Sequence, residues 1–383
     1  MPSTPLRQNV LSQARSIVVK LGTQLLARRD APDAPDGQRG LDRAYCQAMA
    51  AQMVALRARG MQLTIVSSGA IGAGVMELNL PRRPVDVAEQ QAAAAVGQRR
   101  LMDAWHEAFA AHGVSVGQLL LTRADFDDRQ RFLNIRNCVS RLHQWNCIPV
   151  LNENDTVSTE ELGFGDNDML AALMTHALRA NVLVILSVVD GLLDASGQRI
   201  DLVTDIDEAT GHARHEKSAL GTGGMNSKLE AVRLVMEAGE LAVIANGREP
   251  DVLTRLFDAT TCGVGTIFAP SPRKLDSRRR WIGLTKRPAG VMTVDAGAAR
   301  ALTQGGKSLL ASGIVKVDGE FDPGDVVLVR DDHGQELARG LSNYSAQEAR
   351  LIMGRKSSQF QQILGRPGHA EVLHRDNLVL TGR

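Results

Sequence analysis

The sequence predicts an αβα sandwich with an open, mainly parallel sheet, followed by a small C-terminal β-barrel domain. Short apolar runs alternate with longer helical segments from residue 16 to residue 237, which is typical of α/β domains. The apolar runs are continuous, as expected for strands covered by helices on both faces. After residue 281 the pattern changes to short strands with glycine turns, which favours a small barrel.

The elements of the first domain follow in a regular order. The first strand is a β-branched run that ends before Gly22, and each later strand also ends in a polar cluster. In open α/β sheets, ligands bind at the carboxyl ends of the strands. We predict strands at residues 16–20, 61–66, 114–121, 147–151 and 182–187, and helices at 42–59, 88–111, 129–145 and 167–179.

A length of 383 residues favours two domains. The first is predicted to span residues 1–270, and a proline-bearing basic linker to span 271–280. The second domain is predicted to span 281–383, with strands at 313–319 and 324–330.

Composition and charge exclude several classes of protein. The formal net charge is +1, so no general field attracts nucleic acid or an anionic membrane. The four cysteines show no spacing of a metal site or disulfide framework, which favours a reducing cytosol. No signal peptide is evident, and the longest apolar run is far below the ~20 residues that span a bilayer. We therefore expect a soluble cytoplasmic protein.

Two clusters near the N-terminus have the chemistry of an anion site. Lys20 stands at a strand end before the Gly22 turn, and a lysine with exposed backbone N–H groups suits phosphate oxygens. Residues 67–74 read SSGAIGAG and offer hydroxyls and the start of a helix. A dinucleotide fingerprint is excluded because the glycine order is wrong.

Two further clusters complete the set. Residues 152–155 read NEND and are followed by Gly165-Asp166-Asn167-Asp168. So many carboxylates and amides favour a cationic partner, which an ammonium group, a lysine or Mg²⁺ would provide. Residues 221–228 read GTGGMNSK and open a helix, which fits ATP phosphates although the spacing is not that of a Walker A motif. A hydrolase is not indicated, because no G-x-S-x-G elbow is present.

In this order, the clusters resemble those of the amino acid kinase family. The matching stretches extend from Val18 to Lys228 and read VVKLGTQLL, TIVSSGAIGAG, QQAAAAVGQ, LLLTRADFDDRQRFLN, IPVLNENDTV, GDNDML and GTGGMNSK. The sequence after residue 281 resembles a PUA domain, through MTVDAGAARAL, SLLASGIVKVDGEF, PGDVV and ARGLSNYSAQE. This pairing separates the chain from acetylglutamate kinase, aspartokinase and UMP kinase.

The resemblance implies ATP-dependent phosphorylation of the side-chain carboxylate of L-glutamate to L-glutamyl 5-phosphate, the first step of proline biosynthesis. It implies Mg²⁺ carried mainly by ATP without a resident metal site, proline as a feedback inhibitor, and a homo-oligomer. The reaction needs no general base, because the acceptor carboxylate is already ionised at neutral pH. It needs the two reactants to be positioned and their negative charge to be neutralised by cations, and the four clusters offer residues for both tasks.

The resemblance also implies roles for single residues. L-glutamate is expected to contact Ser68, Asp155 and Asn167, with Asp155 meeting the ammonium group and the other two binding the carboxyl ends. Lys20 and Lys228 are expected to neutralise phosphoryl charge, and Asp168 to orient both lysines. ATP is expected to contact Lys20, Ser187, Val188, Thr222, Gly223, Gly224, Met225, Asn226, Ser227 and Lys228.

One departure and two alternatives stand beside this interpretation. The family usually has Thr-Asp where this chain has Ser187-Val188, so a carboxylate near the nucleotide is missing. Another carboxylate kinase, acting on aspartate or N-acetylglutamate, is the alternative enzyme. RNA binding is the alternative from another class, because PUA domains occur in RNA-modifying proteins and residues 278–280 are arginines. The near-zero net charge and few aromatic residues argue against it.

Overall fold

The computed structural model describes residues 11, 14–27, 40–158, 167–207, 224–258, 260–261, 263–269, 282 and 287–381. The chain divides into two compact units, residues 1–274 and 275–383. The predicted linker, residues 271–280, lies outside the described residues. No helix in the described ranges is both long enough and apolar enough to span a membrane.

The first unit is built on an eight-stranded sheet with the order β3-β4-β2-β1-β5-β7-β8-β6. All neighbouring strands are parallel except β7 and β8, which are antiparallel. The mainly parallel sheet predicted from the sequence is therefore confirmed. The strands are β1 (Ser16–Leu21), β2 (Gln62–Ser67), β3 (Val116–Leu121), β4 (Ile148–Glu153), β5 (Val182–Ser187), β6 (Leu202–Val203), β7 (Leu241–Asn246) and β8 (Thr266–Phe268).

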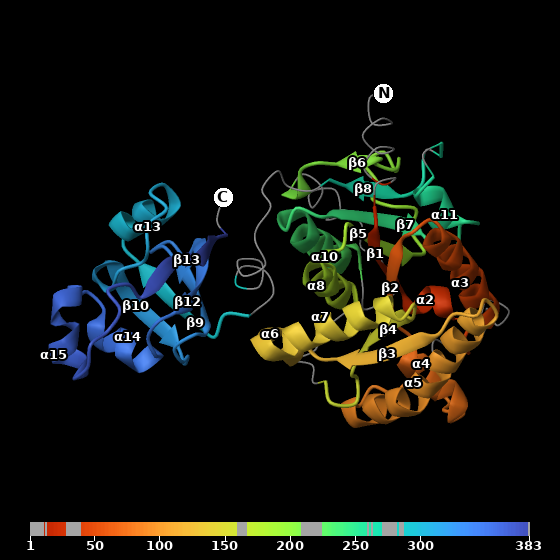
Figure 1. The fold of residues 1–383 in the computed structure, drawn as a ribbon, viewed down its shortest axis with the longest axis horizontal. Coiled ribbons are helices and arrows are strands. Elements are labelled where there is room, and N and C mark those ends of the chain that lie inside the picture. Colours follow the sequence, from red (N-terminus) through yellow and green to blue (C-terminus); the bar gives the residue numbers. More distant parts are fainter. Residues whose placement is uncertain are drawn as a thin grey trace. The chain divides into compact units, whose positions relative to one another are not determined.

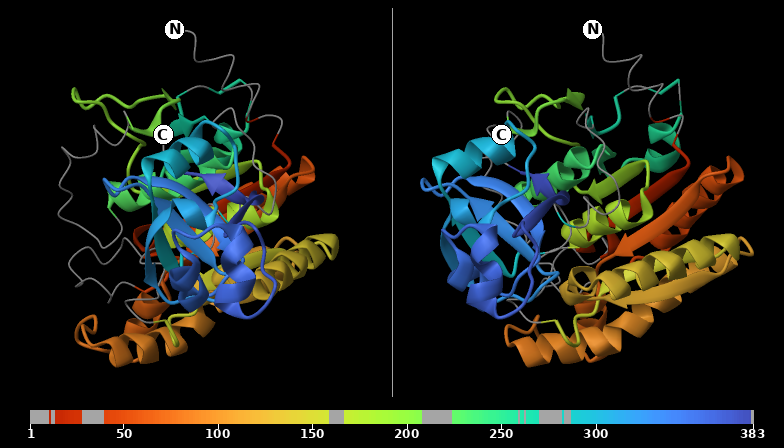
Figure 2. Two further views of the ribbon diagram at one scale, coloured as in Figure 1. Left: turned by 90° about the vertical axis from the view of Figure 1, so that its left-hand side faces the viewer. Right: turned by 60° about the vertical axis from the view of Figure 1, so that its left-hand side comes forward.

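Helices cover both faces of this sheet (Figures 1 and 2). One layer contains α3, α5 and α11, whose apolar side chains share a core with alternate residues of the central strands. The other layer contains α7, α8 and α10, which pack against one another and against the opposite face. The helices are α2 (Thr23–Leu26), α3 (Arg43–Ala58), α4 (Ala70–Glu77), α5 (Val87–Ala110), α6 (Arg123–Asp127), α7 (Arg129–Gln144), α8 (Asn167–Leu178), α10 (Met225–Glu237) and α11 (Val252–Leu256).

Strand β3 departs from the predicted pattern of fully buried strands. Leu120 is partly exposed, as are the first residues of the strand. The cause is its place at the end of the sheet order, where a strand has a neighbour on one side only.

Helices α4 and α5 lie unusually close because glycines face each other at their contact. A Cβ atom on Gly97 would stand 1.9 Å from the carbonyl oxygen of Ala70, and one on Gly74 would stand 1.7 Å from that of Ala93. Gly69, with φ 105°, begins α4 in the left-handed region that favours glycine. These glycines hold α5 against the turn that follows β2.

The C-terminal unit contains a separate five-stranded sheet with the order β10-β9-β11-β12-β13. The predicted small C-terminal β domain is therefore confirmed as a separate unit, and no pairing of β10 with β13 closes its sheet within the described residues. Short helices and the side chains of Tyr344 and Phe360 complete its core. The elements are β9 (Gly290–Val294), α13 (Ala296–Thr303), η2 (Ala311–Gly313), β10 (Ile314–Gly319), β11 (Val326–Arg330), β12 (Glu336–Ser342), α14 (Ala346–Ile352), η3 (Ser357–Gln359), α15 (Phe360–Leu364) and β13 (Leu373–Leu380).

Candidate functional site

The candidate site lies at the carboxyl ends of the parallel strands of the first unit. Lys20 is the penultimate residue of β1, next to Val66 of β2 and Ile185 of β5. Ser67 ends β2 and Ser187 ends β5, so their side chains emerge at the same edge. This is the edge at which ligands bind in open α/β sheets.

The three residues predicted to be catalytic meet at one buried carboxylate. Asp168 is fully buried, and its Oδ1 lies 2.7 Å from Nζ of Lys20. Its Oδ2 lies 3.1 Å from Nζ of Lys228, which is only 6% exposed. Two ammonium groups around one carboxylate leave a net positive charge in a site of low dielectric, where an incoming anion is strongly attracted. We call Lys20, Asp168 and Lys228 the lysine clamp.

The residue before Asp168 contacts the turn after β2. The Asn167 amide nitrogen, Nδ2, donates to Oγ of Ser68 at 2.8 Å and to Oδ1 of Asn152 at 2.9 Å. Two of the predicted substrate-binding residues, Ser68 and Asn167, are thus in direct contact. Asn152 is a third member of this group; the sequence analysis placed it in a polar cluster but gave it no role.

Gln98 of α5 extends the group, and the sequence analysis missed it. Its Oε1 accepts a hydrogen bond of 2.8 Å from Nδ2 of Asn152. Trp105, two helical turns further along α5, donates through Nε1 to Oγ of Ser67 at 2.9 Å. Residues seven apart lie on one face of a helix, so α5 supports both β2 and β4 at the site. Gln98 is the last residue of the family-matching stretch QQAAAAVGQ, but that stretch was given no role in the site.

Asp155 lies in the turn after β4. Its carboxyl is mostly withdrawn from water, and this burial, with the charge of Glu153 as a smaller cause, raises its pKa to about 6. No hydrogen bond joins it to Ser68 or Asn167 within the described ranges. A cation placed beside Asp155 would favour the ionised carboxylate and offset the cost of its burial.

The residues predicted to bind ATP are only partly described. Gly224 precedes the first turn of α10, and Oγ of Ser227 donates to its carbonyl oxygen at 3.0 Å. Met225 and Asn226 belong to the same turn, and the N–H groups at the start of a helix are suited to an anion. Thr222 and Gly223 lie outside the described residues.

The end of β5 contributes the other side of the predicted nucleotide site. Val188 follows Ser187 and is 44% exposed, so an apolar side chain stands where the family usually has a carboxylate. The next carboxylate, Asp190, accepts a hydrogen bond of 2.8 Å from Nδ2 of Asn246.

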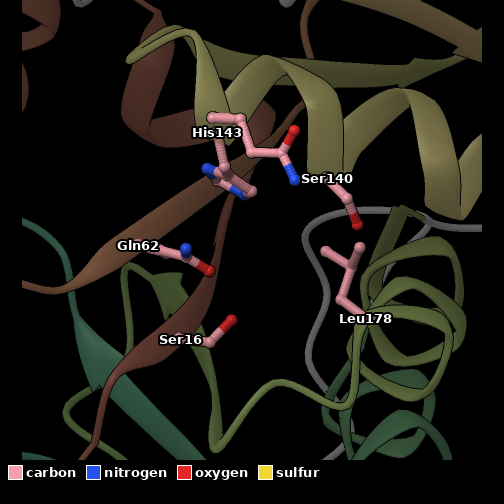
Figure 3. A pocket seen from close by; sticks show the side chains of 6 residues that line it. Ser16, Gln62, Ser140, His143 and Leu178 are labelled. Carbon is pink, nitrogen blue, oxygen red and sulfur yellow. The ribbon is translucent and has the colours of Figure 1, made fainter.

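A separate cavity of about 170 Å³ lies at the amino-terminal edge of the sheet, where Ser16 and Gln62 begin β1 and β2 (Figure 3). His143 lines it, and Nε2 of His143 lies 3.0 Å from Oγ1 of Thr64. Burial, with a smaller effect of Arg57, lowers the pKa of His143 to about 4, so the imidazole is neutral at pH 7. A cavity lined by neutral groups does not suit two anionic substrates.

The sequence of the first unit matches a family model. Residues 15–246 match the amino acid kinase family, and residues 290–364 match the PUA domain. The chain therefore belongs to the amino acid kinase family and has a C-terminal PUA domain.

Within this family the chain groups with proteins named glutamate 5-kinase. It is 42% identical over 384 residues to the glutamate 5-kinase of Syntrophus aciditrophicus, covering 98% of this chain and 97% of that one. It is 43% identical over 382 residues to the glutamate 5-kinase of Geobacter sulfurreducens, covering 98% and 100%.

A solved structure supports the fold alone. N-acetylglutamate synthase from Neisseria gonorrhoeae, in complex with coenzyme A and N-acetyl-glutamate, matches with a TM-score of 0.51 and 17% identity. The match covers 70% of this chain and 62% of that one.

Proposed function

We propose that this protein uses ATP to phosphorylate the side-chain carboxylate of L-glutamate, giving L-glutamyl 5-phosphate in the first step of proline biosynthesis. The observation that carries the proposal is the start of α8. There, Asn167 contacts Ser68 and Asn152, while the next residue, Asp168, holds the two ammonium groups of the lysine clamp. One helix end thus joins a polar pocket for an amino acid to a cationic site for a phosphoryl group.

The chemistry follows from this arrangement. An oxygen of the glutamate side-chain carboxylate attacks the γ-phosphorus of ATP, the bond to the bridging oxygen breaks, and ADP leaves. Both reactants are anions, so the site must bring them together against their repulsion. Lys20 and Lys228 neutralise charge on the transferring group, and Asp168 fixes their positions in advance, so little reorganisation is needed during the reaction.

Glutamate recognition is assigned to Ser68, Asp155 and Asn167. Asp155, in the turn that follows β4, is an ionisable acid and suits the substrate ammonium group. An N-acetyl group removes that positive charge, so N-acetylglutamate is expected to bind poorly. We expect Asp155→Ala to raise KM for glutamate far more than KM for ATP.

The nucleotide is assigned to the first turn of α10 and the end of β5, with Thr222 and Gly223 included from the sequence. Mg²⁺ is expected to arrive with ATP and to neutralise its phosphates. Both oxygens of Asp168 face lysines, so this carboxylate is already engaged by cations of the protein. The described residues also contain no group of three His, Cys, Asp or Glu side chains suited to a metal.

A hydroxamate assay tests the proposal. The full-length protein is incubated with ATP, Mg²⁺ and L-glutamate, and the acyl phosphate is trapped with hydroxylamine; aspartate and N-acetylglutamate are run alongside. We expect glutamate-dependent hydroxamate that Lys20→Ala abolishes. Product with another acid, but not with glutamate, would refute the substrate assignment and leave the family intact.

Three wider features are proposed with this activity: a homo-oligomeric state, a cytoplasmic location and feedback inhibition by proline. They are supported by the family resemblance alone. Gel filtration with light scattering tests the first, fractionation of cells the second, and the hydroxamate assay with added proline the third.

A nucleic-acid role for the PUA domain is not favoured. Four of its described basic side chains, Lys316, Arg330, Arg350 and Arg366, are each within ion-pair distance of an acidic side chain. Such pairing weakens the positive field that phosphate binding requires. Binding of the full chain to single-stranded RNA at low salt would contradict this view.

A further inference from the structure

Three side-chain amides form a continuous chain from α5 to the start of α8. Gln98 Oε1 accepts from Asn152 Nδ2 at 2.8 Å, and Asn152 Oδ1 accepts from Asn167 Nδ2 at 2.9 Å. Asn152 is 3% exposed, so water does not compete for its amide. Each link requires a nitrogen to face an oxygen, and therefore the orientation of one amide dictates the orientation of the next.

A backbone carbonyl helps to fix the orientation of the three amides at the Asn167 end. The Asn167 nitrogen lies 3.3 Å from the backbone carbonyl oxygen of Ser67, which can only accept a hydrogen bond. If the Asn167 amide were reversed, two oxygens would face each other there. Ser68 does not decide the matter, since its hydroxyl can donate or accept. The Ser67 carbonyl and Oδ1 of Asn152 therefore both require the Asn167 nitrogen to point inward. Gln98 Oε1 fixes the Asn152 amide that presents this Oδ1.

Two buried atoms of these three amides have no hydrogen-bond partner within the described residues. They are Oδ1 of Asn167, an acceptor, and Nε2 of Gln98, a donor. A buried acceptor without a donor costs free energy unless a ligand or a water satisfies it. At Asn167 the missing partner must carry an N–H or O–H group. An ionised carboxylate has none, whereas an ammonium group has three.

We propose that Gln98 is a positioning residue, which through Asn152 keeps the Asn167 oxygen directed at the ammonium group of the amino-acid substrate. This inference rests on the proposed function and changes one part of it, because Asn167 was expected from the family resemblance to bind a carboxyl end. Asp155 supplies negative charge to the same ammonium group, and Asn167 supplies a directed acceptor. Gln98 does not touch the substrate in this scheme.

The test compares three ligands that share the reacting carboxylate. Glutamate has both head groups, 4-aminobutyrate has only the ammonium group, and glutarate has only the second carboxylate. KM is measured for glutamate, and inhibition constants against glutamate are measured for the other two. For Gln98→Met we expect binding of glutamate and 4-aminobutyrate to weaken about tenfold, the effect of losing one hydrogen bond to a charged group. Binding of glutarate, KM for ATP and kcat should stay within about twofold.

Two further variants separate positioning from simple packing. Gln98→Glu keeps an oxygen that accepts from Asn152, so it should restore glutamate affinity to within about threefold of the parent protein. Gln90→Met makes the same substitution on the same helix, at a side chain that bonds the carbonyls of Pro84 and Val85, and should change none of the three constants. Thermal unfolding checks that each variant is folded.

Each outcome has a defined meaning. Equal weakening of all three ligands in Gln98→Met would overturn the inference, because it would indicate a general packing role. Loss of glutarate but not 4-aminobutyrate binding would also overturn it, because Gln98 would then act on the carboxylate. The parent protein is assayed first, so absence of any glutamate-dependent product counts against the proposed function itself.

Discussion

Replacing Asp168 by asparagine tests the lysine clamp most directly. The substitution keeps the shape but removes the negative charge that lies 2.7 Å and 3.1 Å from two buried ammonium groups. Breaking a buried ion pair by removing one partner typically costs about 3–5 kcal/mol of unfolding free energy. For a domain of this size, about 2–4 °C of melting temperature corresponds to 1 kcal/mol. We therefore expect the transition of the first unit to fall by about 6–20 °C.

Calorimetry of the full-length protein measures this, with the transition of the PUA domain as an internal reference. The kcat of hydroxamate formation should fall by about a hundredfold or more, because the two lysines lose their fixed positions. Asp103→Asn is the matched control: Asp103 is a half-exposed partner of Arg99 at 3.5 Å, and its loss should cost no more than about 0.5 kcal/mol. A parent-like melting temperature together with a parent-like kcat for Asp168→Asn would refute the reasoning.

Three other predictions address the remaining parts of the first unit. Burial raises the pKa of Asp155 to about 6, and binding of the ammonium group needs the ionised carboxylate. The kcat/KM for glutamate should therefore fall as the pH drops through 6, reaching about a tenth of its plateau value at pH 5. Asp155→Asn should remove this inflection, and its persistence would assign it to another group. Gly97→Ala should lower the free energy of unfolding in urea by more than about 3 kcal/mol, because the new Cβ would meet the Ala70 carbonyl. Gly72→Ala is the control and should leave that free energy nearly unchanged, because the space around Gly72 is open. Val188→Asp should change KM for ATP several-fold without changing KM for glutamate, and an effect on glutamate alone would place Val188 outside the nucleotide site.

The parts of the fold set by local pattern were predictable from the sequence. The apolar run at residues 16–20 and the polar cluster after β4 both occur as expected, since a continuous buried strand and the turn after it leave a clear local signature. The order of the strands was not predicted, because it depends on how distant segments pack. The separate C-terminal β domain was predicted, but whether its sheet closes was not, because short strands with glycine turns suit a closed and an open sheet equally.

The candidate site was likewise predicted only in part from the sequence. Lys20, Asp168 and Lys228 belong to motifs that family resemblance brings together, and their contact is seen in the structure. Gln98 was missed because its significance lies in one hydrogen bond to a residue 54 positions away. The orientation of the Asn167 amide depends on a backbone carbonyl 100 positions away, and no pattern of residue types records such a constraint.

The adjacency of Asn167 and Asp168 has a consequence for how this enzyme can vary. Successive residues of a helix point about 100° apart, so Asn167 faces Ser68 and Asn152 while Asp168 faces the two lysines. Inserting or deleting a single residue at the start of α8 would rotate both side chains away from their partners at once. In the proposed function, acceptor binding and phosphoryl transfer therefore depend on the same helix end and cannot change independently there. We expect a change of substrate to arise from substitutions in the surrounding loops before it arises from this helix.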